Sequence, residues 1–138
     1  MKFIQGNLFQ DHRGTVRFVN DFRFDGVKRF YTITHPDTET IRAWQGHKLE
    51  TKYFFVANGA FRISWVKIDN WNQPSRDLEI QWKELKDSES EILVIEPGRA
   101  TAIQAIIPGS TLVLFSDKTL EQSKADDFRF ETNYWKTG

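Results

Sequence analysis

The fold is decided by residues 42–59, Arg-Ala-Trp-Gln-Gly-His-Lys-Leu-Glu-Thr-Lys-Tyr-Phe-Phe-Val-Ala-Asn-Gly. Within this stretch an apolar run at residues 53–56 leads into Asn58-Gly59, and residues 61–65 then alternate apolar with polar side chains. Asn-Gly between two such runs is typical of a type I′ turn. We therefore predict a β-hairpin over residues 52–68.

The same stretch carries polar side chains at regular spacing. Gln45 and His47 are separated by one residue, so an extended strand would aim both side chains in the same direction. Arg42 is an odd number of residues from both, so its side chain would point to the opposite face of a regular strand unless a bend or a bulge turns it. The pattern predicts a strand with a polar inner face.

Most of the remaining chain has the same two-residue period, in short segments bounded by Gly, Pro, Asn or Asp. Such segments are typical of strands. Further strands are predicted at residues 15–19, 27–33, 78–82, 91–95, 101–107 and 111–115. Residues 69–77 form the longest irregular connection, and only residues 120–127 suit one or two helical turns. About nine or ten short strands predict an all-β sandwich or jelly-roll barrel with at most one short helix near the C-terminus.

Composition narrows the class of protein. The 138 residues include 12 Phe and 5 Trp, enough for the core of one domain spanning residues 1–138. Lys and Arg number 19 and so do Asp and Glu, so we expect no binding to nucleic acid by charge. The absence of cysteine excludes disulfides and thiolate metal sites. No apolar run approaches the length of a membrane span, and we expect a soluble, cytoplasmic protein.

The deciding stretch resembles the metal-binding motif of cupins, which is His-x-His, a Glu after four intervening residues and a Gly after six more. Here Gln45 and His47 stand at the two His positions, Lys52 at the Glu position and Gly59 at the Gly position. An amide is a poor ligand for a transition metal, and an ammonium group repels a cation. We therefore predict a metal-free cupin with no cofactor.

A metal-dependent cupin oxygenase or isomerase is further disfavoured by the positions of the three histidines. His12, His35 and His47 all precede the second half of the chain, so a second metal-binding motif has no His.

Five short motifs, in the right order, resemble the cupin branch of dTDP-4-dehydrorhamnose 3,5-epimerases and WxcM-like dTDP-4-keto-6-deoxyhexose 3,4-ketoisomerases, the RmlC-like cupins. They are Asp11-His-Arg-Gly14, Val27-Lys-Arg-Phe-Tyr31, residues 42–48, Phe115-Ser-Asp117 and Asp126-Asp-Phe-Arg-Phe130. The resemblance covers most of the chain. It implies a cupin jelly roll that acts on a nucleotide-linked deoxysugar in polysaccharide biosynthesis.

Two departures from the family pattern concern proton transfer. Gln45 stands where the epimerases have their catalytic His, and Ser123 stands where they have a general-acid Tyr. Neither an amide nor an aliphatic hydroxyl can replace these groups near neutral pH. The 3,5-epimerase mechanism is therefore disfavoured for this chain.

The resemblance implies catalytic roles for His47, Tyr31 and Lys52, with Arg42 as a second cation. A 4-keto group acidifies the hydrogen on C3, and His47 is the candidate base that removes it. Tyr31 is the candidate acid on the opposite face of the sugar. Arg42 and Lys52 are cations that would favour the neutral imidazole and stabilise the enolate oxygen.

The resemblance also implies binding roles. Arg13 matches the family's diphosphate-binding Arg, and a guanidinium suits the paired oxygens of a phosphate. Arg29, Arg42 and Gln45 are predicted to contact the substrate, with Gln45 orienting the sugar. The apolar residues of segment 1–10 predict a homodimer paired through an N-terminal strand.

Two functions are compatible with these residues. One is an isomerase that performs 3,4-ketoisomerisation or C3 epimerisation of a dTDP- or UDP-linked 4-keto-6-deoxyhexose by His-mediated enolisation. The alternative is a catalytically degenerate cupin that binds a sugar nucleotide without turning it over. The surviving His and cations favour the first, and the loss of both epimerase proton shuttles favours the second.

Overall fold

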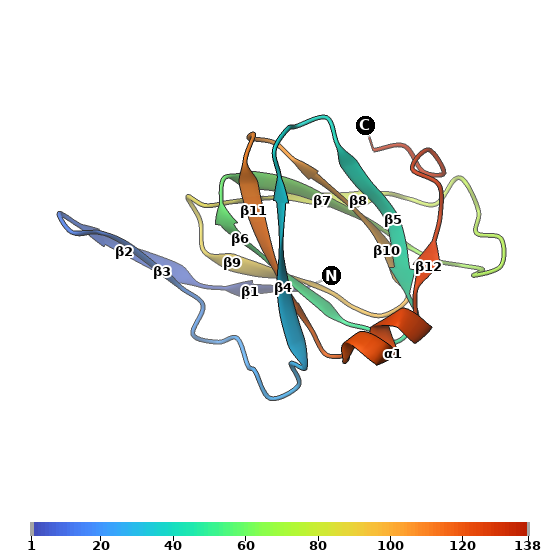
Figure 1. Cartoon of the computed structure of the whole chain (residues 1–138), viewed down its shortest axis with the longest axis horizontal. Helices are drawn as coiled ribbons and strands as arrows, with labels where there is room; N and C mark the ends of the chain where they lie inside the picture. Colours follow the sequence, from blue (N-terminus) through green and yellow to red (C-terminus); the bar gives the residue numbers. More distant parts are fainter. Residues whose placement is uncertain (1, 138) are drawn as a thin grey trace.

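The computed structural model describes residues 2–137 and places two five-stranded antiparallel sheets face to face as a jelly-roll barrel (Figure 1). The strand order is β1-β9-β6-β11-β4 in the first sheet and β12-β5-β10-β7-β8 in the second, and β2 pairs with β3 alone. The first sheet consists of β1 (Lys2–Gln5), β9 (Glu91–Ile95), β6 (Lys52–Asn58), β11 (Ser110–Ser116) and β4 (Arg29–His35). The second consists of β12 (Phe128–Arg129), β5 (Ile41–His47), β10 (Arg99–Ala105), β7 (Ala60–Lys67) and β8 (Gln81–Lys86). The remaining elements are β2 (Asn7–Asp11), β3 (Gly14–Phe18) and the helix α1 (Leu120–Ala125), so the predicted all-β cupin fold with one short helix is confirmed.

The apolar core lies between the two sheets because side chains alternate across each strand. Strand β6 contributes Phe54 and Val56 from one side, and β7 contributes Phe61 and Ile63 from the other. All four side chains are at most 1% exposed. The sequence pattern around residue 59 therefore builds the centre of the barrel.

The connection at Gly59 differs from the predicted hairpin. Strand β6 pairs with β9 and β11, whereas β7 pairs with β8 and β10, so the two strands lie in different sheets. Gly59 has a φ of +82°, but no non-glycine residue in 2–137 has a positive φ, so Asn58-Gly59 is not a type I′ turn. The hairpin prediction is wrong because apolar runs that bury the same core can also face each other across a sandwich.

Strand β5 contains a one-residue bulge at Trp44. Thr101 of β10 lies opposite Gln45, yet the next residue, Ala102, lies opposite Ala43. The extra residue resets the alternation of side chains along the strand. Arg42 and Gln45 consequently line the same cavity, as the sequence required for a shared site.

The other predicted segments agree with the structure to different degrees. Residues 91–95 form β9, residues 111–115 lie within β11, and the predicted helical turns form α1. Residues 69–77 are irregular, as expected. The strand predicted at residues 78–82 begins only at Gln81, where pairing with β7 starts, and Leu78 and Ile80 pack in irregular backbone against the cluster that contains Trp44.

The N-terminal segment forms two separate features. Strand β1 pairs with β9 at the edge of the first sheet, and β2 and β3 form a hairpin that projects from the barrel (Figure 1). Phe9 and Val16 on this hairpin are 56% and 59% exposed. Of the segment 1–10 predicted to mediate dimerisation, Met1 lies outside the described residues. No helix within residues 2–137 is long and apolar enough to cross a membrane.

Candidate functional site

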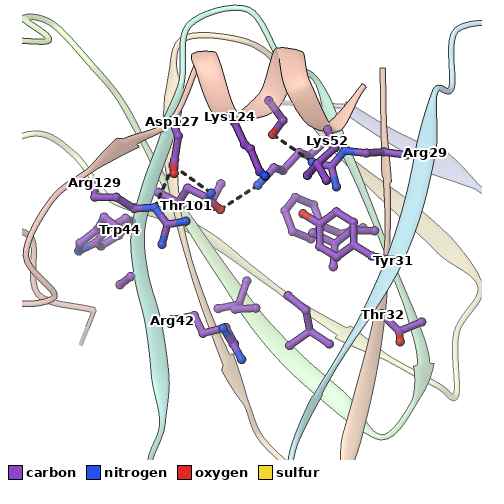
Figure 2. A pocket seen from close by; sticks show the side chains of 18 of the residues that line it. Arg29, Tyr31, Thr32, Arg42, Trp44, Lys52, Thr101, Lys124, Asp127 and Arg129 are labelled. Carbon is purple, nitrogen blue, oxygen red and sulfur yellow. Dashed lines mark hydrogen bonds and ion pairs between the residues drawn. The ribbon is translucent and has the colours of Figure 1, made fainter. Parts of the chain in front are cut away.

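A cavity of about 740 Å³ opens between β4 and β5 and is bordered by α1 and β12 (Figure 2). Its lining within residues 2–137 is strongly cationic, with Asp127 as its one acidic side chain. The cationic side chains are Arg29, Arg42, Lys52, Lys124 and Arg129. A concave surface lined by one sign of charge attracts ligands of the opposite sign. The arrangement therefore suits an anionic ligand.

A chain of hydrogen bonds crosses one wall of this cavity. The Lys52 Nζ donates to Gln45 Oε1 at 3.0 Å, and Gln45 Nε2 donates to Asp127 Oδ1 at 3.1 Å. The same carboxylate oxygen accepts from Arg129 Nε at 2.8 Å. The Gln45 amide thus has a defined orientation that positions the Lys52 nitrogen.

The ammonium group of Lys52 is destabilised by its surroundings. Only 4% of the residue is exposed. Burial, together with the nearby Arg29, lowers the pKa of Lys52 to about 8, and the Glu50 carboxylate opposes this effect. Near neutral pH a fraction of the molecules therefore carries a neutral amine here.

A buried carboxylate lies behind the cavity wall. Glu50 is 2% exposed and accepts hydrogen bonds from Ser123 Oγ at 2.6 Å and Ser116 Oγ at 2.8 Å. Arg29 donates from Nη2 to Ser123 Oγ at 3.0 Å and lies 3.7 Å from Glu50. Ser123, at the family's general-acid position, is therefore part of a structural network that fixes Arg29.

Tyr31 faces the cavity from β4, the wall opposite Arg42 and Trp44 of β5 (Figure 2). The Arg29 guanidinium lies 4.9 Å from the centre of its ring. Burial raises the pKa of Tyr31, an effect that the charge of Arg29 only partly offsets. The phenol therefore keeps its proton near neutral pH and can donate a hydrogen bond to a ligand.

The structure does not place His47 on the cavity wall. The residue is 4% exposed, and its Nδ1 lies 2.6 Å from the backbone oxygen of Asp126. Because a carbonyl oxygen only accepts, Nδ1 carries the hydrogen, and Nε2 has no hydrogen-bond partner among residues 2–137. Burial and then the charge of Lys52 lower the pKa of His47, so the ring is neutral at pH 7. His47 therefore lies outside the cavity lining in this geometry, and its role as the base stays a prediction.

The carboxylate of Asp126 fixes the turn between His47 and Lys52. Its Oδ1 accepts from the backbone N–H of Lys48 at 2.8 Å, and its Oδ2 accepts from Leu49 at 2.8 Å and Glu50 at 3.1 Å. This residue also ends α1. One side chain thereby ties the helix to the turn that carries the site.

Two arginines predicted to bind substrate have different locations. Arg42 lines the cavity, and its Nε donates to Nε2 of the buried His35 at 3.1 Å. Arg13 lies in the turn of the β2–β3 hairpin, is 75% exposed, and pairs with Asp11 at 2.7 Å. The structure thus brings Arg29, Arg42 and Gln45 together but not Arg13, because the hairpin projects away from the barrel of its own chain.

Several residues of the site were not assigned a role from the sequence. Asp127 and Arg129 belong to a motif that marks the family, yet their role emerges only from the pairing of β12 with β5. Neither Lys124 nor Glu50 occupies a motif position that would have indicated a role in the site. Long-range pairing, which one sequence does not reveal, places them here.

The donors in this cavity do not fit a transition metal. The Gln45 oxygen is engaged by the Lys52 amino group, and the imidazole of His47 lies off the wall. Within residues 2–137 no group of three or more His, Cys, Asp or Glu side chains is placed to hold a metal ion.

No family model and no curated protein matches the sequence. Solved structures do match. A QdtA 3,4-ketoisomerase variant from Thermoanaerobacterium thermosaccharolyticum, in complex with TDP, is 25% identical with a TM-score of 0.74 over 97% of this chain and 90% of that one. A second variant, in complex with TDP-4-keto-6-deoxyglucose, is 24% identical with a TM-score of 0.74 over 96% and 89%.

A dTDP-4-dehydrorhamnose 3,5-epimerase from Sulfolobus tokodaii is 20% identical, with a TM-score of 0.76 over 98% of this chain and 79% of that one. These similarities extend over the whole barrel and agree with the motifs read from the sequence. The chain therefore has the fold of the RmlC-like cupins.

Proposed function

We propose that this protein is an isomerase of a nucleotide-linked 4-keto-6-deoxyhexose, and that 3,4-ketoisomerisation is its reaction. The observation that carries the proposal is the cavity itself, in which several cations, a protonated phenol and a buried amine converge. The structural neighbours in complex with TDP and with TDP-4-keto-6-deoxyglucose support this substrate class.

The cations account for affinity toward a sugar nucleotide. A diphosphate carries negative charge at the end of the sugar where the nucleotide is attached, and guanidinium groups bind such oxygens in pairs. The side chain of Arg129 is 69% exposed, and Lys124 comes from α1. These two exposed groups are suited to a dTDP- or UDP-diphosphate, whereas the half-buried Arg29 and Gln45 are suited to contacts with the sugar.

Tyr31 and Arg42, which line opposite walls of the cavity, account for the chemistry at the C4 oxygen. Removing the C3 hydrogen of a 4-keto sugar places negative charge on the C4 oxygen. Tyr31 can donate a hydrogen bond to that oxygen, and Arg42 lies across the cavity as a cation (Figure 2). Preorganised donors and charges that act on a developing oxyanion are a large source of rate enhancement.

A homodimer belongs to the same proposal. Arg13 lies outside the cavity of its own chain, on a projecting hairpin that exposes Phe9 and Val16. Pairing of two copies would cover these side chains. It would also bring Arg13 to the cavity of the second copy, where it could bind the diphosphate.

The test has two steps. First, a panel of dTDP-, UDP- and GDP-sugars is screened by thermal shift, because a ligand that binds only the native state raises its stability. Arg42→Met should abolish the shift given by the wild-type ligand, and Arg23→Met, at an exposed pair with Asp25, should retain it. Second, solvent deuterium should enter C3 of any bound 4-keto sugar, as followed by NMR.

A non-catalytic sugar-nucleotide binder is the second candidate. It is favoured by the engagement of Gln45 and Ser123 in hydrogen bonds and by the location of His47 off the cavity wall. A ligand that binds with no deuterium exchange and no product would establish this function and refute the isomerase.

A further inference from the structure

We infer that Lys52, acting as a neutral amine, is the base that removes and returns the sugar proton, in place of His47. The inference rests on the proposed isomerase function. It replaces the role that the sequence assigned to His47 and changes the role of Lys52 from a fixed cation to a proton carrier.

The first argument is location. Lys52 lines the cavity, and its Nζ is held at 3.0 Å from Gln45 Oε1. His47 does not line the cavity, and its Nδ1 is committed to the carbonyl oxygen of Asp126. A base must come within hydrogen-bond reach of the proton that it removes. Of these two groups, only Lys52 satisfies this condition.

The second argument excludes the other lining groups as the base. Tyr31 holds its proton near neutral pH because burial raises its pKa. Burial would raise the pKa of Asp127, but hydrogen bonds from Arg129 and Gln45 outweigh burial and lower it. A carboxylate with a lowered pKa is a weak base. Lys124 remains, but it extends from α1 and is exposed, whereas Lys52 extends from β6 and is buried.

The third argument is how the surroundings hold the amine. A neutral amine that donates one hydrogen to Gln45 keeps its lone pair for another direction. The groups that act on Lys52 electrostatically come from every side of the site. They are Arg29 of β4, Glu50 of the turn, His47 of β5, and Asp127 and Arg129 of the C-terminal segment. Burial of Lys52 is the largest influence, so its neutral form depends on shielding of the amine from water.

The step conserves atoms and charge. The Lys52 lone pair takes the C3 proton, the C3–H electron pair forms a C3=C4 double bond, and the C4 carbonyl pair moves to its oxygen. The hydroxyl proton on the C3 oxygen passes to the C4 oxygen, and the Tyr31 hydroxyl can relay it. The ammonium then returns its proton to C4, which leaves a 3-keto sugar and the original amine.

The test compares Lys52→Arg with Lys52→Met. Arginine keeps the positive charge but stays protonated, so it cannot act as a base. If Lys52 were only an electrostatic group, Lys52→Arg would retain most of the deuterium exchange. The inference predicts that both variants lose about two to four decades of exchange rate while binding of the sugar nucleotide by Lys52→Arg persists. Lys67→Met, at the exposed end of β7 and outside the cavity lining, is the matched charge control, with binding and exchange rate unchanged.

The pH profile provides a second readout. Because the pKa of Lys52 is about 8, exchange by the wild type should rise through pH 8 and level off above it. A base at His47, whose pKa lies below 6.5, would instead give a rate that is flat from pH 7 to 9. His47→Asn should retain exchange, and its exchange rate should still rise with pH near pH 8, with a shifted midpoint.

The absence of cysteine allows a chemical rescue. Lys52→Cys should be inactive, and alkylation with 2-bromoethylamine should rebuild a primary amine at this single thiol and restore exchange. Restoration also rules out misfolding as the cause of inactivity. Wild-type exchange together with an active Lys52→Arg variant, or with a rate flat from pH 7 to 9, would overturn the inference and leave the isomerase function standing. No exchange by the wild type would refute the isomerase function itself.

Discussion

The two halves of strand β6, one charged and one apolar, are equally buried on their inward side but have chemically opposite surroundings. Its inward residues are Lys52, Phe54 and Val56, with exposures of 4%, 1% and 1%. Around Phe54 and Val56 the neighbours are apolar, whereas around Lys52 they are a carboxylate, guanidinium groups and amides. Burial by itself therefore does not distinguish the core from the site.

The difference lies in what burial does to the free energy. In the apolar half it stabilises the fold by removing hydrocarbon from water. In the charged half it disfavours the ionised form of Lys52, a cost that the Glu50 carboxylate reduces only in part. The barrel thus uses the stability of one half to maintain a reactive group in the other.

The largest expected effect tests the apolar half. Phe61 is fully buried, so Phe61→Ala should lower the free energy of unfolding by about 3–5 kcal/mol, as is usual for a large core residue. Urea denaturation followed by Trp fluorescence measures this loss. Phe30→Ala, at a residue that is 68% exposed, is the control and should change stability by about 0.5 kcal/mol or less. Equal losses in the two variants would contradict the location of the core.

The next effect tests the charged half through pH. The folded state lowers the pKa of Lys52 from 10.5 to about 8, so between these values the unfolded chain binds more protons and stability rises with pH. Relative to Lys52→Met, the wild type should gain on the order of 3 kcal/mol from pH 7 to above pH 10.

Urea titrations of both proteins at several pH values measure this gain. Lys67→Met, at the exposed end of β7, is the matched control. A stability difference between wild type and Lys52→Met that does not change with pH would show that Lys52 is hydrated.

A smaller effect tests whether Arg13 of a second copy completes the ligand site. If Arg13 binds diphosphate in a partner's cavity, Arg13→Ala should weaken every diphosphate ligand by about 1.5–3 kcal/mol, the scale of a hydrogen bond to a charged group. Calorimetry measures the affinity, and the chemical step should change less. Sedimentation should give a dimer at micromolar concentration. A clean monomer that binds these ligands with wild-type affinity would contradict this role.

The smallest effect concerns the N-terminal cap of α1, the helix that borders the cavity. Thr119 caps α1: its Oγ1 accepts from the N–H of Gln122 at 3.2 Å, and the Gln122 side chain accepts from the N–H of Thr119 at 2.9 Å. Thr119→Ala should cost about 1 kcal/mol of stability. Thr119→Ser keeps the hydroxyl and should cost little. Thermal unfolding distinguishes the two, and similar midpoints would show that the cap is not needed.

The fold was largely predictable because each strand carries its own two-residue pattern and turn residues. The stretch 91–95 predicted β9 with the correct bounds, and the helical turns after residue 120 were also identified. Which strands pair was not predictable in the same way. Asn58-Gly59 indicated a hairpin, but whether two apolar strands pair or face each other depends on partners such as β11 that lie far along the chain.

The candidate site was predictable only in part for the same reason. Residues within one motif, such as Gln45 and Lys52, were identified together because their spacing is local. The role of Asp127 depends on β12 pairing with β5, and the burial of His47 depends on the carbonyl of Asp126. Both are contacts between residues about 80 positions apart, and a short sequence motif does not reveal such contacts.

The bulge at Trp44 has a consequence for evolution and for alignment. Because it resets which side chains face inward, the spacing between Arg42 and Gln45 matters as much as their identities. A regular strand with the same residues would turn Arg42 to the outer face and keep Gln45 inside, so loss of the bulge alone would remove a cavity side chain while every motif letter survived. Deletion of residue 44 would instead leave Arg42 and Gln45 two positions apart in a regular strand, with both side chains on the inner face. A one-residue gap at this position in an alignment is therefore compatible with the same cavity lining.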